Sequence, residues 1–216
     1  KLRNARKGMI AFVSLYNPIK DQAFQSLAGP ERQARLKELH QAAIQADYAP
    51  LNLEQSNLEP LIKAIVAHQS KLRHCWLIAT SGDKGSQVYL PALVKYLREG
   101  KGIPALQGEA GCEFHTGEAY QVQVDGRGDT EVVEETRQLV DSIFQEAHQK
   151  EIRLKDNEIV ADITGAPRNM LFGMLLACLD GQRDIQFNAT DYADGVPTGE
   201  PVPMIYHFEP RFVKNE

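Results

Sequence analysis

The sequence is poor in cysteine and lacks both a long apolar run and an excess of positive charge. Each of these absences excludes a class of protein. The 216 residues include three cysteines, Cys75, Cys112 and Cys178. They are far apart and odd in number, so they do not suggest a disulfide framework. Two of them lie in apolar segments, where free cysteine acts as a small hydrophobic residue. This usage is typical of a reducing compartment.

The net charge also limits the class of partner. Lysine and arginine number 24 against 29 acids, which leaves a charge of −5. A nucleic-acid-binding domain is usually basic over a whole face, so we expect no direct DNA binding. The hydrophobic fraction of 43% and the charged fraction of 25% are ordinary for a globular domain. A domain of this size does not need disulfides or a metal to be stable.

No segment of the sequence is long enough to cross a membrane. The longest apolar run, Met170 to Leu179, is about half the length of a span, and no signal peptide is visible. The basic start, which contains Arg3, Arg6 and Lys7, is similar to the cytoplasmic flank of a membrane helix. A solvated tail explains it equally well.

Both interpretations of the basic start remain open. Residues 1–7 are then a juxtamembrane or linker segment, and residues 8–216 are one ligand-sensing domain. In the first interpretation, this is a cytoplasmic domain tethered to the inner face of the membrane through a segment upstream of Lys1.

Apolar patterning predicts strands that alternate with helices. The expected strands are Gly8 to Ser14, Cys75 to Thr80, Ile159 to Ile163, Ile185 to Tyr192 and Pro203 to Phe208, with a short one at Ala49 to Leu53 and a hairpin or edge element around Tyr120 to Val124. The expected helices are Glu31 to Ala46, Leu58 to Gln69, Gln87 to Arg98, Asp129 to Gln149 and Asn169 to Leu179. The alternation predicts an α/β fold, Rossmann-like and doubly wound, with a mainly parallel sheet and helices on both faces.

In such a sheet, ligands bind outside the carboxyl ends of the strands. The sharpest candidate is the loop from Asp162 to Arg168. Gly165 permits a tight turn, Thr164 could cap the next helix, and Pro167 suits its first turn. The helix N-terminus and the Arg168 guanidinium would then face an anion, while Asp162 would fix the loop. The alternative is a plain turn.

Two further loops leave expected strand ends. The loop from Ser81 to Ser86 offers glycines, hydroxyls and Lys84, and could form an amide nest for phosphate although it is not a Walker A loop. In the loop after the first strand, Tyr16 could stack on a base and Asn17 could bond its edge. The full set of candidate ligand-binding residues is Ser14, Leu15, Tyr16, Asn17, Thr80, Ser81, Gly82, Lys84, Ser86, Thr164, Gly165, Ala166, Arg168 and Asn169.

Other patterns are weaker. Gly126–Gly128 begins like a dinucleotide fingerprint, but Glu131 occupies the place of the third glycine. Glu113, His115 and Glu118 have a spacing that is too loose to predict a metal site, so we expect no metal and no cofactor. The helix Met170 to Leu179 is apolar nearly all round and needs partners on two sides. One is the sheet, and the other is either the rest of the chain or a second copy.

The loop motif carries a family resemblance. A strand that ends in D-x-[ST]-x-x-x-[RK] and opens a late helix resembles the CRISPR-associated Rossmann fold (CARF) family, and Asp162, Thr164 and Arg168 match it. The loops after the first strand and after the Trp76 strand fall where that family also builds its pocket. The resemblance spans roughly Gly8 to Phe208.

The resemblance implies a homodimer with one pocket across its two-fold axis. The regulatory ligand would be a cyclic oligoadenylate, foremost cyclic tetra-adenylate, made during type III CRISPR antiviral defence. Binding would switch an attached effector. Many relatives read G-G-[TS]-K where this chain has Gly165, Ala166, Pro167 and Arg168, which argues against cleavage of the ligand. We therefore assign no catalytic residue. A ring nuclease and an unrelated nucleotide-binding Rossmann enzyme remain the alternatives.

Overall fold

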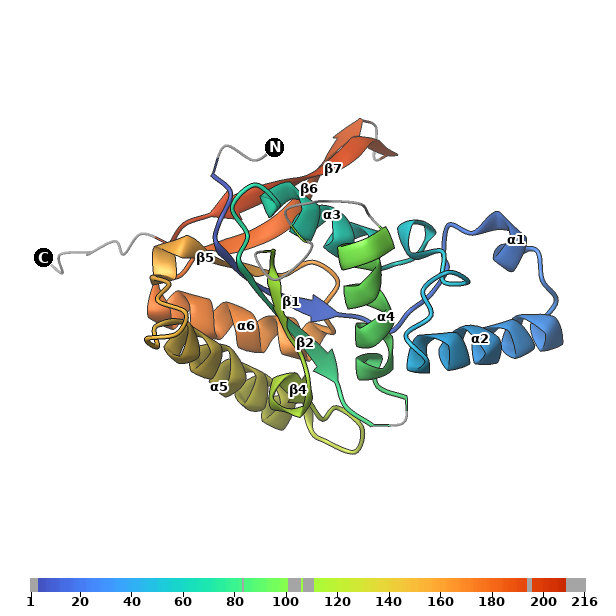
Figure 1. Ribbon diagram of the computed structural model, residues 1–216, viewed down its shortest axis with the longest axis horizontal. Coiled ribbons are helices and arrows are strands. Elements are labelled where there is room, and N and C mark those ends of the chain that lie inside the picture. Colours follow the sequence, from blue (N-terminus) through green and yellow to red (C-terminus); the bar gives the residue numbers. More distant parts are fainter. Residues whose placement is uncertain (1–3, 83, 101–105, 107–110, 194–195, 209–216) are drawn as a thin grey trace, which may run out of the picture.

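The protein is an α/β domain built on a seven-stranded, mostly parallel sheet (Figure 1). The computed structural model describes residues 4–82, 84–100, 106, 111–193 and 196–208, with the backbone alone for 190–201. The strands are β1 (Gly8–Val13), β2 (His74–Thr80), β3 (Glu113–His115), β4 (Gln121–Val122), β5 (Ile159–Asp162), β6 (Ile185–Ala193) and β7 (Val196–Tyr206). The helices are α1 (Gln22–Gln25), α2 (Gly29–Ile44), α3 (Glu59–His68), α4 (Leu90–Lys95), α5 (Asp129–Ala147) and α6 (Arg168–Gly181).

The strand order places a topological switch point at the centre of the sheet. The order is β3-β2-β1-β5-β6-β7, and β4 also pairs with β2. Every pair is parallel except β6 with β7. The chain moves outward from β1 through β2 to β3, and then outward on the other side from β5 to β6. The order therefore reverses between β1 and β5, which is where α/β sheets open a crevice for ligands.

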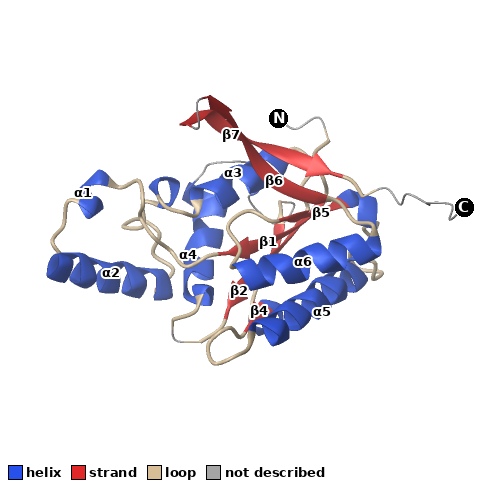
Figure 2. Cartoon of the chain, turned by 180° about the vertical axis from the view of Figure 1, so that it is seen from behind, coloured by secondary structure: helices blue, strands red, loops and turns tan. Residues whose placement is uncertain are grey.

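Helices cover both faces of the sheet, and the alternation along β1 shows why. Met9, Ala11 and Val13 pack into one apolar cluster, which includes side chains of α3 and α4. Ile10 and Phe12 point the other way, into a cluster with α5 and α6. The helices α5 and α6 lie side by side on their face in both views (Figure 2). The expected doubly wound architecture is confirmed.

One local expectation was wrong, and two others left alternatives that the structure decides. Ala49 to Leu53 forms no strand, because the chain turns there and enters a 3-10 helix at Leu53–Gln55. Of the hairpin or edge element expected around Tyr120, the structure has the edge element, because β4 pairs in parallel with the end of β2 outside the main strand order. In the helix expected from about Gln87, Pro91 predicts a late start or a kink. The α-helix does start late, at Leu90, and Pro91 lies in its first turn, where the missing N–H costs no hydrogen bond.

The basic start is part of the folded domain from Ala5 onward. Ala5 is buried, Arg6 forms an ion pair with Asp184 at 2.5 Å, and Lys7 forms one with Glu158 at 2.6 Å. Within the residues that the structure describes, none of the helices combines the length and the apolarity that crossing a bilayer would require.

Candidate functional site

The loops that follow β1, β2 and β5 meet in one cavity. It has a volume of about 580 Å³ and lies at the switch point, where the strand order reverses. Its lining comes from the three loops and from two further segments: Val13, Ser14, Leu15, Asn57, Thr80, Ser81, Lys84, Gly85, Ser86, Val124, Asp125, Gly165, Ala166 and Pro167. The structure thus brings together three segments that lie about 65 and 80 residues apart along the chain, as expected for the shared edge of parallel strands.

The loop after β1 is held by an asparagine that the sequence analysis did not identify. The Asn57 Nδ2 group donates to the Ser14 hydroxyl at 3.0 Å and to the Leu15 carbonyl at 2.6 Å. Its Oδ1 accepts the Asn17 N–H at 2.7 Å. Asn57 therefore fixes the course of this loop and contributes to the cavity wall. Leu15 is exposed at 53%, so it offers apolar surface beside the cavity.

Tyr16 and Asn17 are placed differently from the expectation. Tyr16 is buried, with its ring 5.6 Å from that of Tyr89, and burial raises its pKa to about 12. It packs into the core and does not face the cavity at the switch point. Asn17 is exposed and borders a neighbouring depression together with Tyr16. Neither residue is positioned to hold a base in the central cavity.

The loop after β2 is closed at its neck by two hydroxyl side chains. The Thr80 N–H donates to the Ser86 Oγ at 2.9 Å, and the Ser86 N–H donates to the Thr80 Oγ1 at 2.8 Å. This reciprocal pair fixes the base of the loop, so Thr80 and Ser86 shape the cavity wall. A Cβ on Gly85 would overlap the Thr80 carbonyl oxygen, and glycine is therefore required for the chain to close so tightly.

Hydrogen bonds within the protein occupy several of the backbone N–H groups that were expected to form an amide nest. The Ser81 N–H donates to the Val122 carbonyl at 3.0 Å, and the Gly85 N–H donates to the Gly82 carbonyl at 2.8 Å. With Ser86 N–H also occupied, three backbone donors of the loop are committed. What this loop offers the cavity is the Ser81 side chain and the Lys84 ammonium. Gly82 adopts φ +100° and is outside the lining.

The loop after β5 turns through Gly165, as expected. Its φ of +76° lies in the left-handed region, while a Cβ there would meet nothing within 4 Å. Backbone conformation, and not space, therefore requires glycine. One expectation was wrong: the N-cap of α6 is Pro167, without a side-chain bond, so Thr164 does not cap the helix. The Thr164 N–H instead donates to the Asp162 Oδ1 at 2.9 Å.

Asp162 belongs to a buried hydrogen-bond relay. The Arg6 N–H donates to the His68 Nδ1 at 2.8 Å. Because Nδ1 accepts, the neutral imidazole carries its proton on Nε2. The His68 Nε2 lies 2.6 Å from the Gln186 Oε1, and the Gln186 Nε2 donates to the Asp162 Oδ2 at 2.8 Å. With the Thr164 N–H at the other oxygen, backbone donors terminate the relay at both ends and set its direction.

Burial governs the protonation of this relay. His68, Gln186 and Asp162 are all fully buried. Burial lowers the pKa of His68, which keeps the imidazole neutral. Burial raises the pKa of Asp162 to about 6, although its hydrogen bonds from Gln186 and Thr164 work against this shift. The relay connects β5, β6 and α3, and it anchors the loop at Thr164, which is the supporting role expected of Asp162.

Arg168 and Asn169 lie beside the central cavity and not in it. Both border a separate depression of about 550 Å³, together with Asp129, Val133 and Phe172. Asn169 is held there, because its Nδ2 donates to the Asp129 Oδ1 at 3.2 Å. Arg168 is exposed on the first turn of α6. Arg168 therefore contributes to this second depression and is not among the residues that line the central cavity.

Sequence reasoning also missed the wall formed by Val124 and Asp125. These residues follow β4, whose parallel pairing with the end of β2 brings them to the cavity. Asp125 is exposed, and its carboxylate carries the opposite charge to the Lys84 ammonium. Among the residues that the structure describes, the charged members of the lining are Lys84 and Asp125.

The outer face of α6 is apolar and uncovered. Phe172 is exposed at 56%, Leu179 at 49% and Leu176 at 36%, while Met170 and Met174 on the opposite face are buried. Full burial of this helix within a single chain, one of the two expectations, was wrong. Phe172 also borders the depression next to Arg168, so the apolar face continues to the N-terminus of α6.

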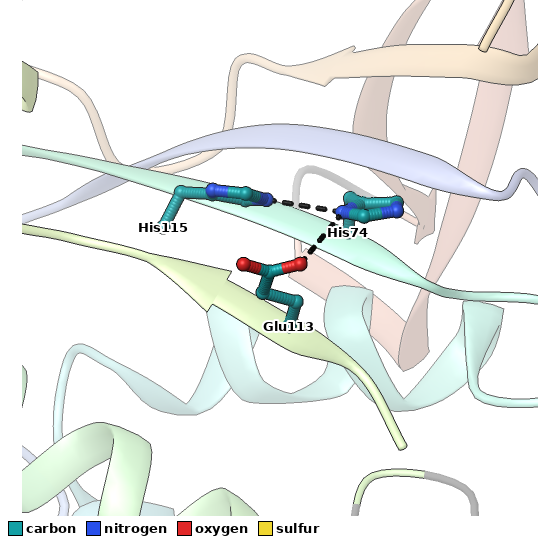
Figure 3. A group of neighbouring side chains, drawn as sticks. All are labelled: His74, Glu113 and His115. Carbon is teal, nitrogen blue, oxygen red and sulfur yellow. Dashed lines mark hydrogen bonds and ion pairs between the residues drawn. The ribbon is translucent and has the colours of Figure 1, made fainter. Parts of the chain in front are cut away.

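A second polar cluster lies at the far end of β2. Glu113 and His115 on β3 meet His74 on β2 (Figure 3). Glu118, the third member of the group considered from sequence, lies in a 3-10 helix outside this cluster. His74 was not considered, because only the register of β2 against β3 brings it there.

Comparison of the chain with protein-family models finds no matching family, and comparison with curated proteins finds no matching protein. Function therefore has to be inferred from the residues of the site.

Proposed function

We propose that this domain is a sensor that binds a cyclic oligoadenylate, with cyclic tetra-adenylate as the first candidate, across the two-fold axis of a homodimer. Binding would switch an attached effector in type III CRISPR antiviral defence. Two observations support this function: the family resemblance at Asp162, Thr164 and Arg168, and the geometry of the cavity.

The observation that carries the proposal is the meeting of three loops in one cavity at the switch point. Ser14, Ser81, Lys84 and Gly165 come from three different strand ends and line the same space. Hydroxyls, an ammonium and a tight glycine turn are groups that recognise phosphates. The volume, about 580 Å³, is in the range that encloses a small ligand.

The placement of Arg168 supports a site that is shared by two copies. A ring of four nucleotides is larger than the ligands that one such cavity usually encloses. Arg168 lies outside the cavity of its own chain, next to the apolar face formed by Phe172, Leu176 and Leu179. If this face packs on itself about a two-fold axis, the same patch of both copies forms the interface, and residues near the axis meet their own counterparts. The two Arg168 guanidinium groups then lie between the two cavities, where they can grip the shared ring.

Switching follows from this arrangement. A ligand that contacts both copies binds best to the relative orientation in which both sets of loops reach it, and it shifts the dimer toward that orientation. The energy available is limited to the difference in affinity between the two orientations.

The same lining favours one second candidate, a metal-independent ring nuclease. In that reaction a ribose 2′-hydroxyl loses its proton and its oxygen bonds to the adjacent phosphorus, the bond from phosphorus to the 5′-oxygen breaks, and the 5′-oxygen takes up a proton. The ring opens to a linear product with a 2′,3′-cyclic phosphate and a 5′-hydroxyl. The Ser81 hydroxyl and the Lys84 ammonium line the cavity and could position the phosphate and stabilise its charge.

Isothermal titration calorimetry tests the proposal. Cyclic tri-, tetra- and hexa-adenylate are titrated into the wild type and into Arg168→Glu, with AMP and NAD as further ligands. We expect a ring ligand to bind at one ring per two chains, and Arg168→Glu to lose at least tenfold in affinity. Binding of AMP or NAD at one per chain, without ring binding, would instead identify a nucleotide-dependent Rossmann enzyme. Chromatography of the incubated ligand for linear products separates the sensor from the ring nuclease.

A further inference from the structure

We propose that His74, Glu113 and His115 form a binding site for a divalent transition-metal ion, with Zn²⁺ as the best match. The site lies on the β2–β3 edge, at the opposite end of β2 from the cavity. It is independent of the proposed ligand, because the six steps from His74 to Thr80 along an extended strand separate the two by roughly 20 Å.

The strand register places the three side chains on one face. His74 pairs with Glu113 and Trp76 pairs with His115. Glu113 and His115 are two residues apart on β3, so they point to the same side of the sheet as His74. Figure 3 shows the two imidazoles facing each other with the Glu113 carboxylate beside His74.

The distances between the donor atoms match those around a small metal ion. The His74 Nδ1 lies 3.1 Å from the His115 Nε2 and 3.4 Å from the Glu113 Oε2, and the three ligand atoms lie within 4.8 Å of one another. Ligands about 2.0–2.2 Å from a tetrahedral zinc ion are separated by about 3.4 Å. Small rotations of the side chains would therefore direct all three lone pairs to a common centre.

A second carboxylate lies near the far nitrogen of the His115 ring. The Glu146 Oε1 lies 3.8 Å from the His115 Nδ1. Glu146 is itself fixed, because it accepts the Trp76 Nε1–H at 3.1 Å and the Tyr120 hydroxyl at 2.9 Å. The His115 ring stacks on Trp76 with centroids 4.7 Å apart. A carboxylate that accepts a hydrogen bond from the far nitrogen is the usual support of a metal-binding imidazole, since it leaves the other nitrogen free for the ion. Glu146 would take this role if a small side-chain shift shortened the 3.8 Å separation.

Two histidines and one carboxylate supply three ligands, which leaves the fourth position of a four-coordinate zinc ion open. The Glu113 side chain is exposed at 63%, so water can reach the ion and fill that position. The ion would join β3, a strand of three residues, to the buried strand β2. Since the native strands create the site, bound metal would stabilise the folded state.

Calorimetry with ZnCl₂ tests this site on the full chain, purified without a histidine tag and after treatment with EDTA. We expect one Zn²⁺ per chain and a higher melting temperature with the ion. His115→Ala should abolish binding. Glu146→Gln, which removes only the supporting carboxylate, should weaken it about 10-fold or more. Co²⁺ should give the intense visible absorption of a four-coordinate complex in the wild type.

Two further variants keep the result interpretable. Glu113→Gln changes an exposed side chain, so it tests a ligand even if His115→Ala fails to fold, and it should weaken binding at least 10-fold. His148→Gln removes an exposed histidine outside the cluster and should leave the affinity unchanged. Absence of Zn²⁺ binding by the wild type, or equal affinity of wild type and Glu113→Gln, would overturn the proposal.

Discussion

Replacement of Gln186 by methionine breaks the buried relay at its centre. Methionine has a similar length and volume but neither donates nor accepts as an amide does. The His68 Nε2–H loses its acceptor, and the Asp162 Oδ2 loses its donor. The His68 imidazole and the Asp162 carboxylate remain buried, because methionine fills the space of glutamine and the surrounding strands keep their positions.

The cost can be worked out from these two groups. A buried polar group left without a partner costs about 1–3 kcal/mol, and two such groups cost roughly 2–6 kcal/mol. Part of this cost is offset, because burying a methionine side chain carries no penalty for removing the water that binds an amide. We expect a net loss of about 3 kcal/mol in the free energy of unfolding. In a protein of this size that corresponds to a fall in Tm of roughly 6–12 °C.

The loss should depend on pH, through Asp162. Its folded pKa, about 6, is above the ordinary value of 3.8, so the folded state binds the proton more tightly than the unfolded state. Stability from this proton is present at acid pH and is lost as pH rises through about 6. Without the Gln186 bond, which lowers the pKa, the folded pKa moves further up. The difference between wild type and variant should therefore widen from pH 5 to pH 8.

Urea unfolding followed by circular dichroism at pH 5, 6, 7 and 8 measures both effects. Gln41→Met makes the same chemical change at an exposed position of α2 and should stay within about 0.5 kcal/mol of the wild type. The reasoning is refuted if Gln186→Met unfolds like this control, or if its deficit is the same at all four pH values.

Two other predictions concern the turn before α6 and the face behind it. Gly165→Ala should lower the free energy of unfolding by about 1–2 kcal/mol, because its φ of +76° disfavours any side chain. Gly29→Ala, at the first position of α2 with open space around a Cβ, should not lower it in the same urea titration, and equal losses in the two variants would show that the turn is not strained by a side chain. In sedimentation equilibrium, the wild type should be the proposed homodimer and Phe172→Glu should be a monomer, while the stability of each chain stays within about 0.5 kcal/mol, since Phe172 is exposed at 56%. A monomeric wild type would contradict the proposed dimer, and a dimeric variant would place its contact elsewhere.

The sheet could be predicted from the sequence because its central strands are continuous apolar runs. Gly8–Val13 and His74–Thr80 are buried along almost their whole lengths, and such runs need helices on both sides. The meeting of the three loops followed from the same inference, since parallel strands end at one edge. Side-chain burial on α2 was less predictable. Leu36 and Ile44 have helical spacing but are exposed.

The parts that could not be predicted depend on contacts between distant segments. Asn57 has no motif, and its role arises because the start of α3 passes beside the loop after β1. His74 joins Glu113 and His115 only through the register of β2 with β3. The position of Arg168, outside the cavity, depends on the direction in which α6 leaves its turn. Sequence spacing determines none of these.

The cavity itself is tested most directly through Lys84, the lysine in its lining. Calorimetry with cyclic tetra-adenylate would compare the wild type with Lys84→Glu and with Lys37→Glu, which makes the same charge change on an exposed position of α2. We predict that Lys84→Glu binds at least tenfold more weakly, a difference of about 1.4 kcal/mol or more, and that Lys37→Glu binds like the wild type. Equal affinity of all three proteins would contradict the assignment of this cavity as the ligand site.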